Sequence, residues 1–253
     1  MLNDFNYGIL DQTAHRPWPM PQAPWVMTQT WHDLLFAHWP VNAATLRAKV
    51  PAAFELDTFE GQAWLGIVPF HMSNVAPRAV PALPWISAFP ELNVRTYVRV
   101  GGHGGVYFFS LDAANSVAVG VARVLAHLPY FSAEMQVAIK DDGWMHYSSR
   151  RTSSSGAKAE LQGRYRPSGP VHEPVAGTLE HFLTERYCLF TVDSAARAYR
   201  LDIHHPPWPL QPAEADLPVN TMAEAAGIPL PSAEPLLHFA KRQDMVAWTP
   251  SKL

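Results

Sequence analysis

Two β-type runs joined by a short glycine segment constrain the fold of this chain more than any other feature. Residues 91–100 and 106–111 are rich in β-branched and aromatic side chains, which favour a pleated, half-buried strand. Four of the five residues 101–105 are glycines, and glycine tolerates the positive φ angles that tight turns demand. The segment therefore predicts a β-hairpin.

A phosphate-binding loop is the alternative interpretation of these glycines. Such a loop needs a helix after the glycines, because the anion is bound by the free amides of the helix N-terminus. Here a strand-like run follows, and no Gly-Lys-Ser or Gly-Lys-Thr is present after it. Nucleotide binding is therefore disfavoured.

Most of the remaining chain also has the pattern of short strands joined by turns. Strands are predicted in 34–41, on both sides of Glu60-Gly61 within 54–72, in 116–131 with a bulge at Gly120, in a second hairpin formed by 144–151 and 158–166, and in 186–192, 198–203 and 235–248. Short helices are predicted at 43–50, capped by Asn42, and at 179–185, capped by Thr178. Many short strands without βαβ alternation indicate a closed or sandwich-like antiparallel architecture.

The N-terminal region differs from this pattern. Residues 15–25 read HRPWPMPQAPW, and their prolines prevent a helix interior or a central strand. Trp18 and Trp25 favour an arm docked on the body over a disordered tail, because disordered segments are poor in large aromatic residues. We expect an extended arm at 1–30 and a single domain at 31–253.

Composition narrows the class of ligand and the compartment. The net charge is −3 with only 16% charged residues and no Lys/Arg block, so neither nucleic acid nor an anionic membrane is an expected partner. A small-molecule ligand is expected, and the sequence leaves open whether the chain forms a homo-oligomer.

The cellular location is predicted from three absences. The chain has a single cysteine, no basic-then-apolar leader and no apolar run of about 18 residues, and we therefore expect a cytoplasmic protein. Ser251-Lys252-Leu253 matches a peroxisomal address, although coincidence is the favoured interpretation of so short a signal.

Several familiar chemistries lack support. The pair His204-His205 suggests a metal site, but adjacent side chains of a strand point to opposite faces, and no further ligand spacing is visible. Cys188 lies in an apolar run where a buried, inert thiol is usual, and no G-x-S-x-G motif is present. We expect no metal and no cofactor.

One predicted strand has an unusual polar face. In ELNVRTYV, Glu91, Asn93, Arg95 and Tyr97 share one face, whereas the alternating residues on the other face are mostly apolar. Glu91 and Arg95 lie about 13 Å apart along the strand, too far for direct neutralisation. The polar face is turned either toward solvent or toward a polar-lined cavity.

An ordered series of motifs extends over nearly the whole chain, from Trp31 to Trp248. The series comprises LLFAHWPVNAATLRAKVPAAFELDTFEGQAWLGIVPF, FPELNVRTYV, GVYFFSLDA, AHLPYFSAEM, FLTERYCLF, HHPPWPLQ and PLLHFAKR. It resembles the YqjF-like family (domain of unknown function 2071), which in turn is similar to the acetoacetate decarboxylases. The resemblance implies a mainly β (α+β) fold, in which an antiparallel β-barrel with a flanking sheet and a few short helices encloses a buried cavity. It also favours the interpretation that the Glu91 side chain faces this cavity rather than solvent.

The decarboxylases of this resemblance use a Schiff-base lysine beside a second lysine, just after a proline. The matching positions after Pro129 hold Tyr130 and Phe131. A phenol and a phenyl ring cannot form an imine. The resemblance therefore implies the fold without the decarboxylase chemistry.

The leading hypothesis is a protein that binds a small carbonyl compound or carboxylic acid in its barrel. If it is an enzyme, lyase-like or isomerase-like acid–base chemistry is expected, with Glu91 as base, Tyr130 as hydrogen-bond donor to an oxyanion and Arg95 or Arg123 as carboxylate clamp. Further substrate-binding candidates are Asn93, Arg123, His127 and His38. A non-catalytic binding or sensing protein is the alternative, and a structural protein with a filled barrel is a third interpretation.

Overall fold

The computed structural model describes residues 4–81, 87–114 and 127–253, which form mostly strands. The strands are β1 (Met27–Val41), β2 (Glu55–Leu56), β3 (Ala63–Pro77), β4 (Phe89–Val100), β5 (His103–Ala113), β6 (Tyr130–Ile139), β7 (Met145–Arg151), β8 (Glu160–Pro167), β9 (Cys188–Val192), β10 (Ala198–His204), β11 (Leu210–Asn220), β12 (Leu236–Ala247) and β13 (Ser251–Lys252). The helices are the short 3-10 helix η1 (Tyr7–Asp11), α1 (Ala43–Arg47), α3 (Leu179–Thr184) and α4 (Met222–Ala225).

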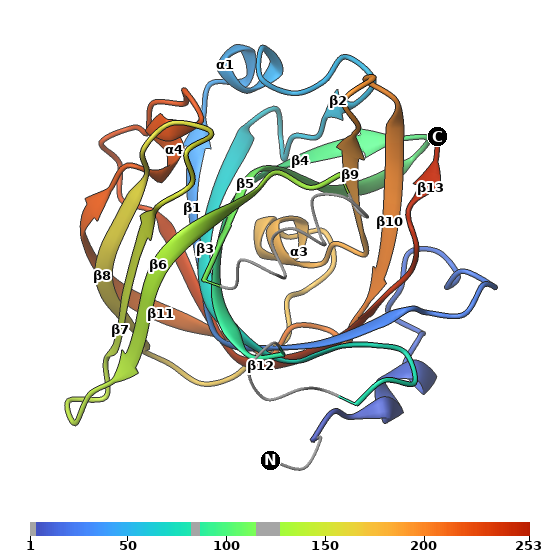
Figure 1. Cartoon of the computed structure of the whole chain (residues 1–253), viewed down its shortest axis with the longest axis horizontal. Helices are drawn as coiled ribbons and strands as arrows, with labels where there is room; N and C mark the ends of the chain where they lie inside the picture. Colours follow the sequence, from blue (N-terminus) through green and yellow to red (C-terminus); the bar gives the residue numbers. More distant parts are fainter. Residues whose placement is uncertain (1–3, 82–86, 115–126) are drawn as a thin grey trace.

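The strand pairings close two rings that share a wall. One ring runs through β5, β6, β7, β8, β11, β12, β1, β3 and β4, and the last strand pairs again with β5. The second ring leaves β5 through β9 and β10 and returns through β12, β1, β3 and β4. Figure 1 looks into the second ring, with α3 lying inside it, and shows β6, β7, β8 and β11 to its left. The predicted mainly β barrel with additional strands is therefore confirmed.

The shared strands send alternate side chains into two compartments. On β4, Leu92 and Val94 point into a dense apolar cluster, whereas Glu91, Asn93 and Arg95 line a cavity on the other face. We call the first side the filled compartment, because large side chains such as Tyr147 and Tyr165 occupy it. We call the second side, enclosed by the ring of β9 and β10, the hollow compartment.

The local predictions with clear turn or capping signals are confirmed. β4 and β5 form the expected hairpin, and Gly101 and Gly102 at its turn have positive φ angles of 55° and 83°. Asn42 accepts hydrogen bonds from the first-turn amides of α1, and Thr178 accepts one from His181 N at the start of α3. β7 and β8 pair as the second predicted hairpin.

Several features differ from the prediction. β11 was not predicted, because it contains Pro212 and Pro218 and proline is unusual inside a sheet. Both prolines lie at irregular places: Pro218 falls within a register shift, and at Pro212 the strand changes its partner from β12 to β8. β6 begins at Tyr130 and extends to Ile139, so the strand lies later than expected, while positions 116–126 fall outside the described residues. β5 pairs in parallel with β6 and with β9, unlike the antiparallel pairs elsewhere. The N-terminal region holds η1, and β1 already begins at Met27.

The N-terminal region lies against the edge of the hollow ring. Phe5 and Ile9 are buried with Val246 and Trp248, the residues at and just beyond the end of β12. Further along, Trp18 contacts the ring of His103 edge-on at 4.6 Å. These aromatic and aliphatic contacts attach the segment to the strands that carry the cavity wall.

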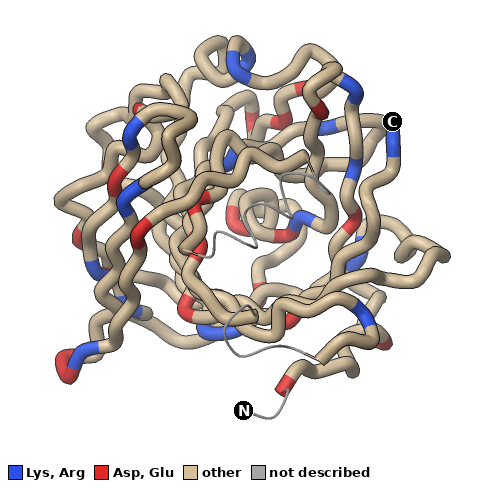
Figure 2. Tube along the Cα trace, viewed as in Figure 1, with Lys and Arg blue, Asp and Glu red and all other residues tan. Residues whose placement is uncertain are grey.

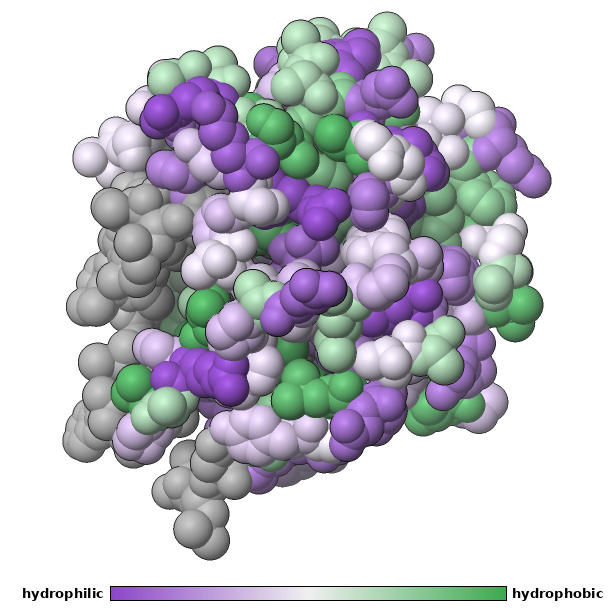
Figure 3. Space-filling view, turned by 90° about the vertical axis from the view of Figure 1, so that its right-hand side faces the viewer, coloured by the Kyte–Doolittle hydropathy of each residue, from purple (hydrophilic) through white to green (hydrophobic). Residues whose placement is uncertain are grey.

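The surface carries charges of both signs. Figure 2 shows basic and acidic residues interspersed along the chain, and the face drawn in Figure 3 mixes hydrophilic and hydrophobic residues. None of the helices in the described ranges is long and apolar enough to cross a membrane.

Candidate functional site

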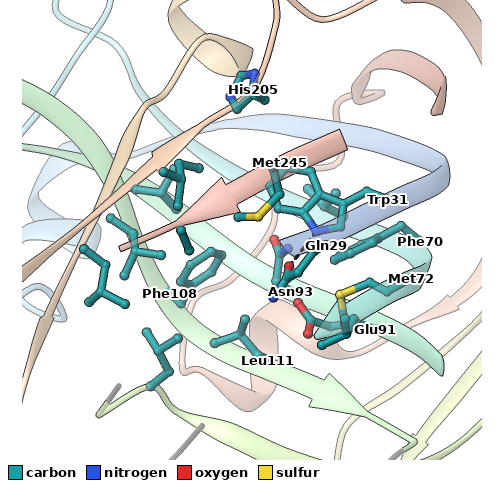
Figure 4. Close-up of a pocket in the computed structure, with 18 of the residues that line it drawn as sticks. Gln29, Trp31, Phe70, Met72, Glu91, Asn93, Phe108, Leu111, His205 and Met245 are labelled. Atoms are coloured by element: carbon teal, nitrogen blue, oxygen red, sulfur yellow. Dashed lines mark hydrogen bonds between the residues drawn. The ribbon is translucent and has the colours of Figure 1, made fainter. Parts of the chain in front are cut away.

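The hollow compartment contains a cavity of about 370 Å³, a typical size for a small-molecule site. Most of its wall is apolar, and Figure 4 shows Trp31, Phe70, Phe108 and Leu111 around it. The polar side chains on the wall are Gln29, Glu91, Asn93, Arg95, Tyr130, Thr184, Arg186 and His205. An apolar cavity with a few convergent polar groups is the usual form of a binding site.

Glu91 is a buried carboxyl group, and no Lys or Arg among the described residues forms an ion pair with it. Its side chain projects from β4 into the cavity, and Tyr130 donates a hydrogen bond of 2.8 Å to its Oε2. Burial raises the pKa of Glu91 to about 8, the Tyr130 hydrogen bond opposes this rise, and the Asp112 carboxylate adds to it. Arg151 does not compensate, because it is paired with Asp112 at 2.6 Å.

Tyr130 stays protonated over the whole physiological range. Burial, and then the neighbouring Glu91, raise the pKa of its phenol well above the ordinary value. The hydroxyl is therefore a permanent hydrogen-bond donor next to a carboxyl group that titrates near neutrality. Glu91 can therefore accept a proton from a bound molecule, and Tyr130 can donate a hydrogen bond to that molecule.

Arg95 is a buried cation with no carboxylate within ion-pair distance in the described part of the chain. It is 9% exposed, its Nη2 donates to the Leu183 carbonyl at 3.3 Å, and its guanidinium lies 5.1 Å from the centre of the Phe36 ring. Burying a charge without a partner is costly, so such a site favours an anion.

Unpaired polar atoms mark the same wall. Four buried atoms of cavity-lining side chains lack a hydrogen-bond partner among the residues that the structure describes, namely Asn93 Oδ1, Arg95 Nε, Arg186 Nη2 and Trp208 Nε1. Buried polar groups are normally hydrogen-bonded, so each of these atoms is available to a ligand or to water. Their side chains all border the cavity.

Arg186 and Thr184 reach the cavity from α3 and the residues after it, and sequence reasoning missed both. Asp57 accepts a hydrogen bond of 2.8 Å from Arg186 Nη1 and also pairs with Arg99 at 3.0 Å. Arg186 Nη2 is buried and has no partner in the described ranges. No local pattern could have identified these residues, because only the packing of α3 inside the ring brings them to the wall.

His38 lies behind the cavity wall and is not among the residues that line it. Its Nε2 is 2.6 Å from the Tyr97 hydroxyl, which itself donates to the Leu183 carbonyl at 2.7 Å. Because the single Tyr97 proton is used for Leu183, His38 Nε2 acts as the donor to Tyr97. Burial lowers the pKa of His38 well below its usual value, so the ring is neutral. This series of hydrogen bonds ends at the Leu183 carbonyl, which also accepts a hydrogen bond from Arg95.

The other predicted residues have different positions. His127 has a φ of 52° and does not line the cavity; its ring centre lies 5.1 Å from that of Tyr199, with the two rings tilted. Arg123 lies outside the described residues. His205 borders the cavity, whereas His204 interacts with the N-terminal segment through the Ile9 carbonyl. Within residues 4–81, 87–114 and 127–253, no group of three or more His, Cys, Asp or Glu side chains is arranged to hold a metal.

No lysine lines the cavity in the described part of the chain. Tyr130 occupies the wall where the decarboxylase resemblance implies a reactive lysine, and the Phe131 ring lies 4.0 Å from the Arg151 guanidinium. Lys241 is paired with Asp33, and its side chain is 66% exposed.

Solved structures with the same architecture define the class of fold. The chain is similar to an acetoacetate decarboxylase from Legionella pneumophila (TM-score 0.59, 14% identity, 100% of this chain and 98% of the other covered). It is also similar to an acetoacetate decarboxylase-like enzyme from Sphingomonas wittichii RW1 (TM-score 0.63, 12% identity, 94% and 97% covered). A third similar structure is the enduracididine biosynthesis enzyme MppR complexed with pyruvate (TM-score 0.61, 10% identity, 93% of each chain covered). The fold is thus acetoacetate decarboxylase-like, as predicted.

Sequence comparison defines the family. The model of DUF2071, described as an uncharacterized conserved protein, matches residues 28–244. The uncharacterized protein YqjF of Bacillus subtilis (strain 168) is 47% identical over 229 residues, which cover 90% of this chain and 93% of the relative. The chain belongs to the DUF2071 family, and the resemblance inferred from its motifs is confirmed.

Proposed function

We propose that the cavity binds a small organic acid that carries a carbonyl group, and that Glu91 and Tyr130 perform acid–base chemistry on it. The observation that carries this proposal is the pair formed by Glu91 and Tyr130 at 2.8 Å, buried on the wall of an apolar cavity. A raised carboxyl pKa in a cleft is typical of catalytic groups. The unpaired Arg95 on the same wall supplies the attraction for an acid.

In this mechanism the ionised Glu91 removes a proton from the carbon next to the ligand's carbonyl group. The electron pair of that C–H bond moves to the carbonyl oxygen, and the resulting enolate receives a hydrogen bond from Tyr130. Glu91 exchanges this proton with solvent and returns a proton to the same carbon, which gives hydrogen exchange or, at a stereogenic carbon, isomerisation by inversion of configuration. A pKa of about 8 makes Glu91 a stronger base than an ordinary carboxylate.

The absence of a lysine from the described wall separates this chemistry from that of a Schiff-base decarboxylase. The carbonyl group stays a carbonyl throughout, so the oxyanion must be stabilised by hydrogen bonds rather than by an iminium ion. Tyr130 occupies a suitable place for this role because its hydroxyl already lies next to the base.

The test combines a binding screen with proton exchange. Carboxylic acids and ketones are screened for thermal stabilisation of the protein, and each hit is incubated in D₂O while the α-proton signals are followed by NMR. We expect exchange that Glu91→Gln slows by about 10²–10⁴-fold, the usual contribution of a general base. Glu60→Gln, an exposed turn residue, serves as the matched control. Exchange at the wild-type rate in Glu91→Gln would disprove the assigned role.

Non-catalytic binding or sensing is the alternative function. It is supported by the largely apolar wall and by a Glu91 that is mostly protonated, and so a poor base, at pH 7. Stabilisation by a ligand without exchange or turnover at any pH up to 9 would favour this alternative.

A further inference from the structure

Glu91 and Arg95 mark two poles of the cavity wall along β4. Glu91 and Arg95 lie four residues apart on β4, which corresponds to about 13 Å. The register shift in this hairpin places the extra residue, Phe109, in β5, so β4 keeps its regular alternation. The two side chains therefore face the same cavity from positions that are far apart.

The contacts of each pole hold it away from the other. Arg95 is directed toward the far end of the strand, where its guanidinium lies 5.8 Å from the centre of the Tyr97 ring and bonds to the Leu183 carbonyl. Glu91 is held by Tyr130 at the opposite end. The groups that perturb the pKa of Glu91 are Tyr130 and Asp112, and Arg95 is not one of them. The separation of about 13 Å along β4 therefore keeps the two charged groups apart.

Between the poles β4 carries the polar Asn93, and most of the other side chains on the described wall are apolar. The strand neighbours of Asn93 are Val68 on β3 and Leu111 on β5, and both border the cavity. This stretch suits methylene groups, because burying each one contributes about 0.8 kcal/mol.

We propose that the ligand is an oxo carboxylic acid whose carbonyl and carboxylate groups are separated by an apolar chain, with the carboxylate bound by Arg95 and the carbonyl beside Glu91 and Tyr130. This inference rests on the proposed function and specifies its substrate class. In a 3-oxo acid the two groups are separated by two C–C bonds of about 1.5 Å each, too close to reach both poles. An intervening chain of roughly four to eight carbons spans the distance.

The separation has a chemical consequence. Decarboxylation of a 3-oxo acid requires a carbonyl beside the carbon that loses CO₂, because the electron pair of the broken C–C bond moves to the carbonyl oxygen as an enolate. A remote carboxylate cannot use the carbonyl in this way and is retained as an anchor. The reaction then occurs only at the carbons beside the carbonyl, where Glu91 can remove and return a proton.

A series of methyl ketone monocarboxylates tests the inference by calorimetry at pH 7. The series runs from acetoacetate through 4-oxopentanoate, 5-oxohexanoate, 7-oxooctanoate and 9-oxodecanoate to 12-oxotridecanoate, whose chain is longer than the proposed span. We expect Kd to fall about fourfold for each added methylene until the chain spans both poles, the ratio that corresponds to 0.8 kcal/mol. Beyond that length Kd should rise again.

Variants assign the poles with the tightest ligand of the series. Arg95→Met should weaken binding about 30-fold or more and abolish the preference for the acid over its methyl ester. Glu91→Gln should weaken it less, and the double variant should show additive effects, because sites more than about 7–10 Å apart rarely couple. Arg150→Met is the control, since the Arg150 side chain is 65% exposed on β7.

The outcomes separate this inference from the proposed function. If acetoacetate binds as tightly as the longer acids and shows exchange dependent on Glu91, the separated-group inference is wrong and the proposed function stands. Strong coupling between the two variants, or an unchanged Kd in Arg95→Met, also overturns the inference. Failure of every acid in the series to bind overturns both.

Discussion

The filled and the hollow compartment use the same strands in opposite ways. On one face of β4, Leu92 and Val94 pack among the tyrosines and leucines of the filled compartment. On the other face, Glu91, Asn93 and Arg95 border a cavity of about 370 Å³. Because successive side chains of a strand alternate between faces, one strand can stabilise the fold and build a site at once.

The difference shows where this protein tolerates poor packing. A side chain beside a void loses the dispersion contacts that a packed neighbour would supply, and an unpaired charge such as Arg95 adds a desolvation cost. The filled compartment contains the compensating apolar burial. Four predictions test this division, from the largest expected effect to the smallest.

The first prediction concerns the pH dependence that Glu91 imposes. The unfolded chain releases the Glu91 proton near pH 4.5, whereas the folded protein keeps it until about pH 8. The group therefore destabilises the fold increasingly between these values, by about 4–5 kcal/mol in total, and has no effect below pH 4.5. Glu91→Gln should show a correspondingly flatter curve of unfolding free energy against pH.

Denaturant unfolding between pH 4 and pH 9 measures this effect. Glu60→Gln should follow the wild-type curve because this turn residue is exposed. Parallel curves for wild type and Glu91→Gln would mean that the carboxyl group is solvated.

The second prediction concerns the ion pair between Arg151 and Asp112, the carboxylate that adds to the raised pKa of Glu91. Arg151 and Asp112 are almost fully buried and lie 2.6 Å apart. Arg151→Met leaves Asp112 buried without its partner and should cost about 3–5 kcal/mol of unfolding free energy. Arg150→Met changes the adjacent residue, whose ion pair with Glu134 is exposed, and should cost at most about 1 kcal/mol. Equal costs would contradict the buried pair.

The third prediction compares matched leucines of the two compartments. Leu161 is fully buried in the filled compartment, and Leu111 borders the cavity. Leu161→Ala should cost about 3–5 kcal/mol, because it opens a new void. Leu111→Ala should cost about 2 kcal/mol less, because its side chain already has fewer contacts. A larger loss for Leu111→Ala would show that the hollow compartment is packed in solution.

The fourth prediction expects no change at all. Treatment with acetoacetate and borohydride should leave the protein mass unaltered, because the family resemblance implies Tyr130 at the position of the reactive lysine. Intact-mass spectrometry measures the result. A reduced adduct on any of the lysines would restore imine chemistry to this cavity.

The local part of the candidate site could be predicted because it depends on a period of two residues. The alternation in ELNVRTYV was sufficient to place Glu91, Asn93 and Arg95 on one face of β4. Tyr130 joined this set through the family resemblance, and its hydroxyl lies 2.8 Å from Glu91. The roles of these residues remain predictions.

The rest of the wall could not be predicted from local pattern. His38 shares a strand with cavity residues, yet it contacts Tyr97 behind the wall, and His127 does not reach the cavity. Arg186 and Thr184 have no sequence signal, because their positions depend on α3 lying inside the ring.

The amino-acid sequence by itself determined the elements with local causes. These include the glycine turn between β4 and β5, the caps at Asn42 and Thr178, the alternating faces of the strands and the replacement of the lysine by Tyr130. The turn, the caps and the alternation follow from backbone sterics or hydrogen bonds within a few residues, whereas the place of Tyr130 is what the family resemblance implies. Only the tertiary structure decided which face of β4 borders the cavity, that Arg186 is paired with Asp57 while Arg95 has no carboxylate beside it among the described residues, and which strands enclose the cavity. Those outcomes depend on pairings such as β1 with β12, whose partners Met27 and Ala247 stand at opposite ends of the chain. No local preference specifies such a contact, because its free energy exists only after distant strands have met.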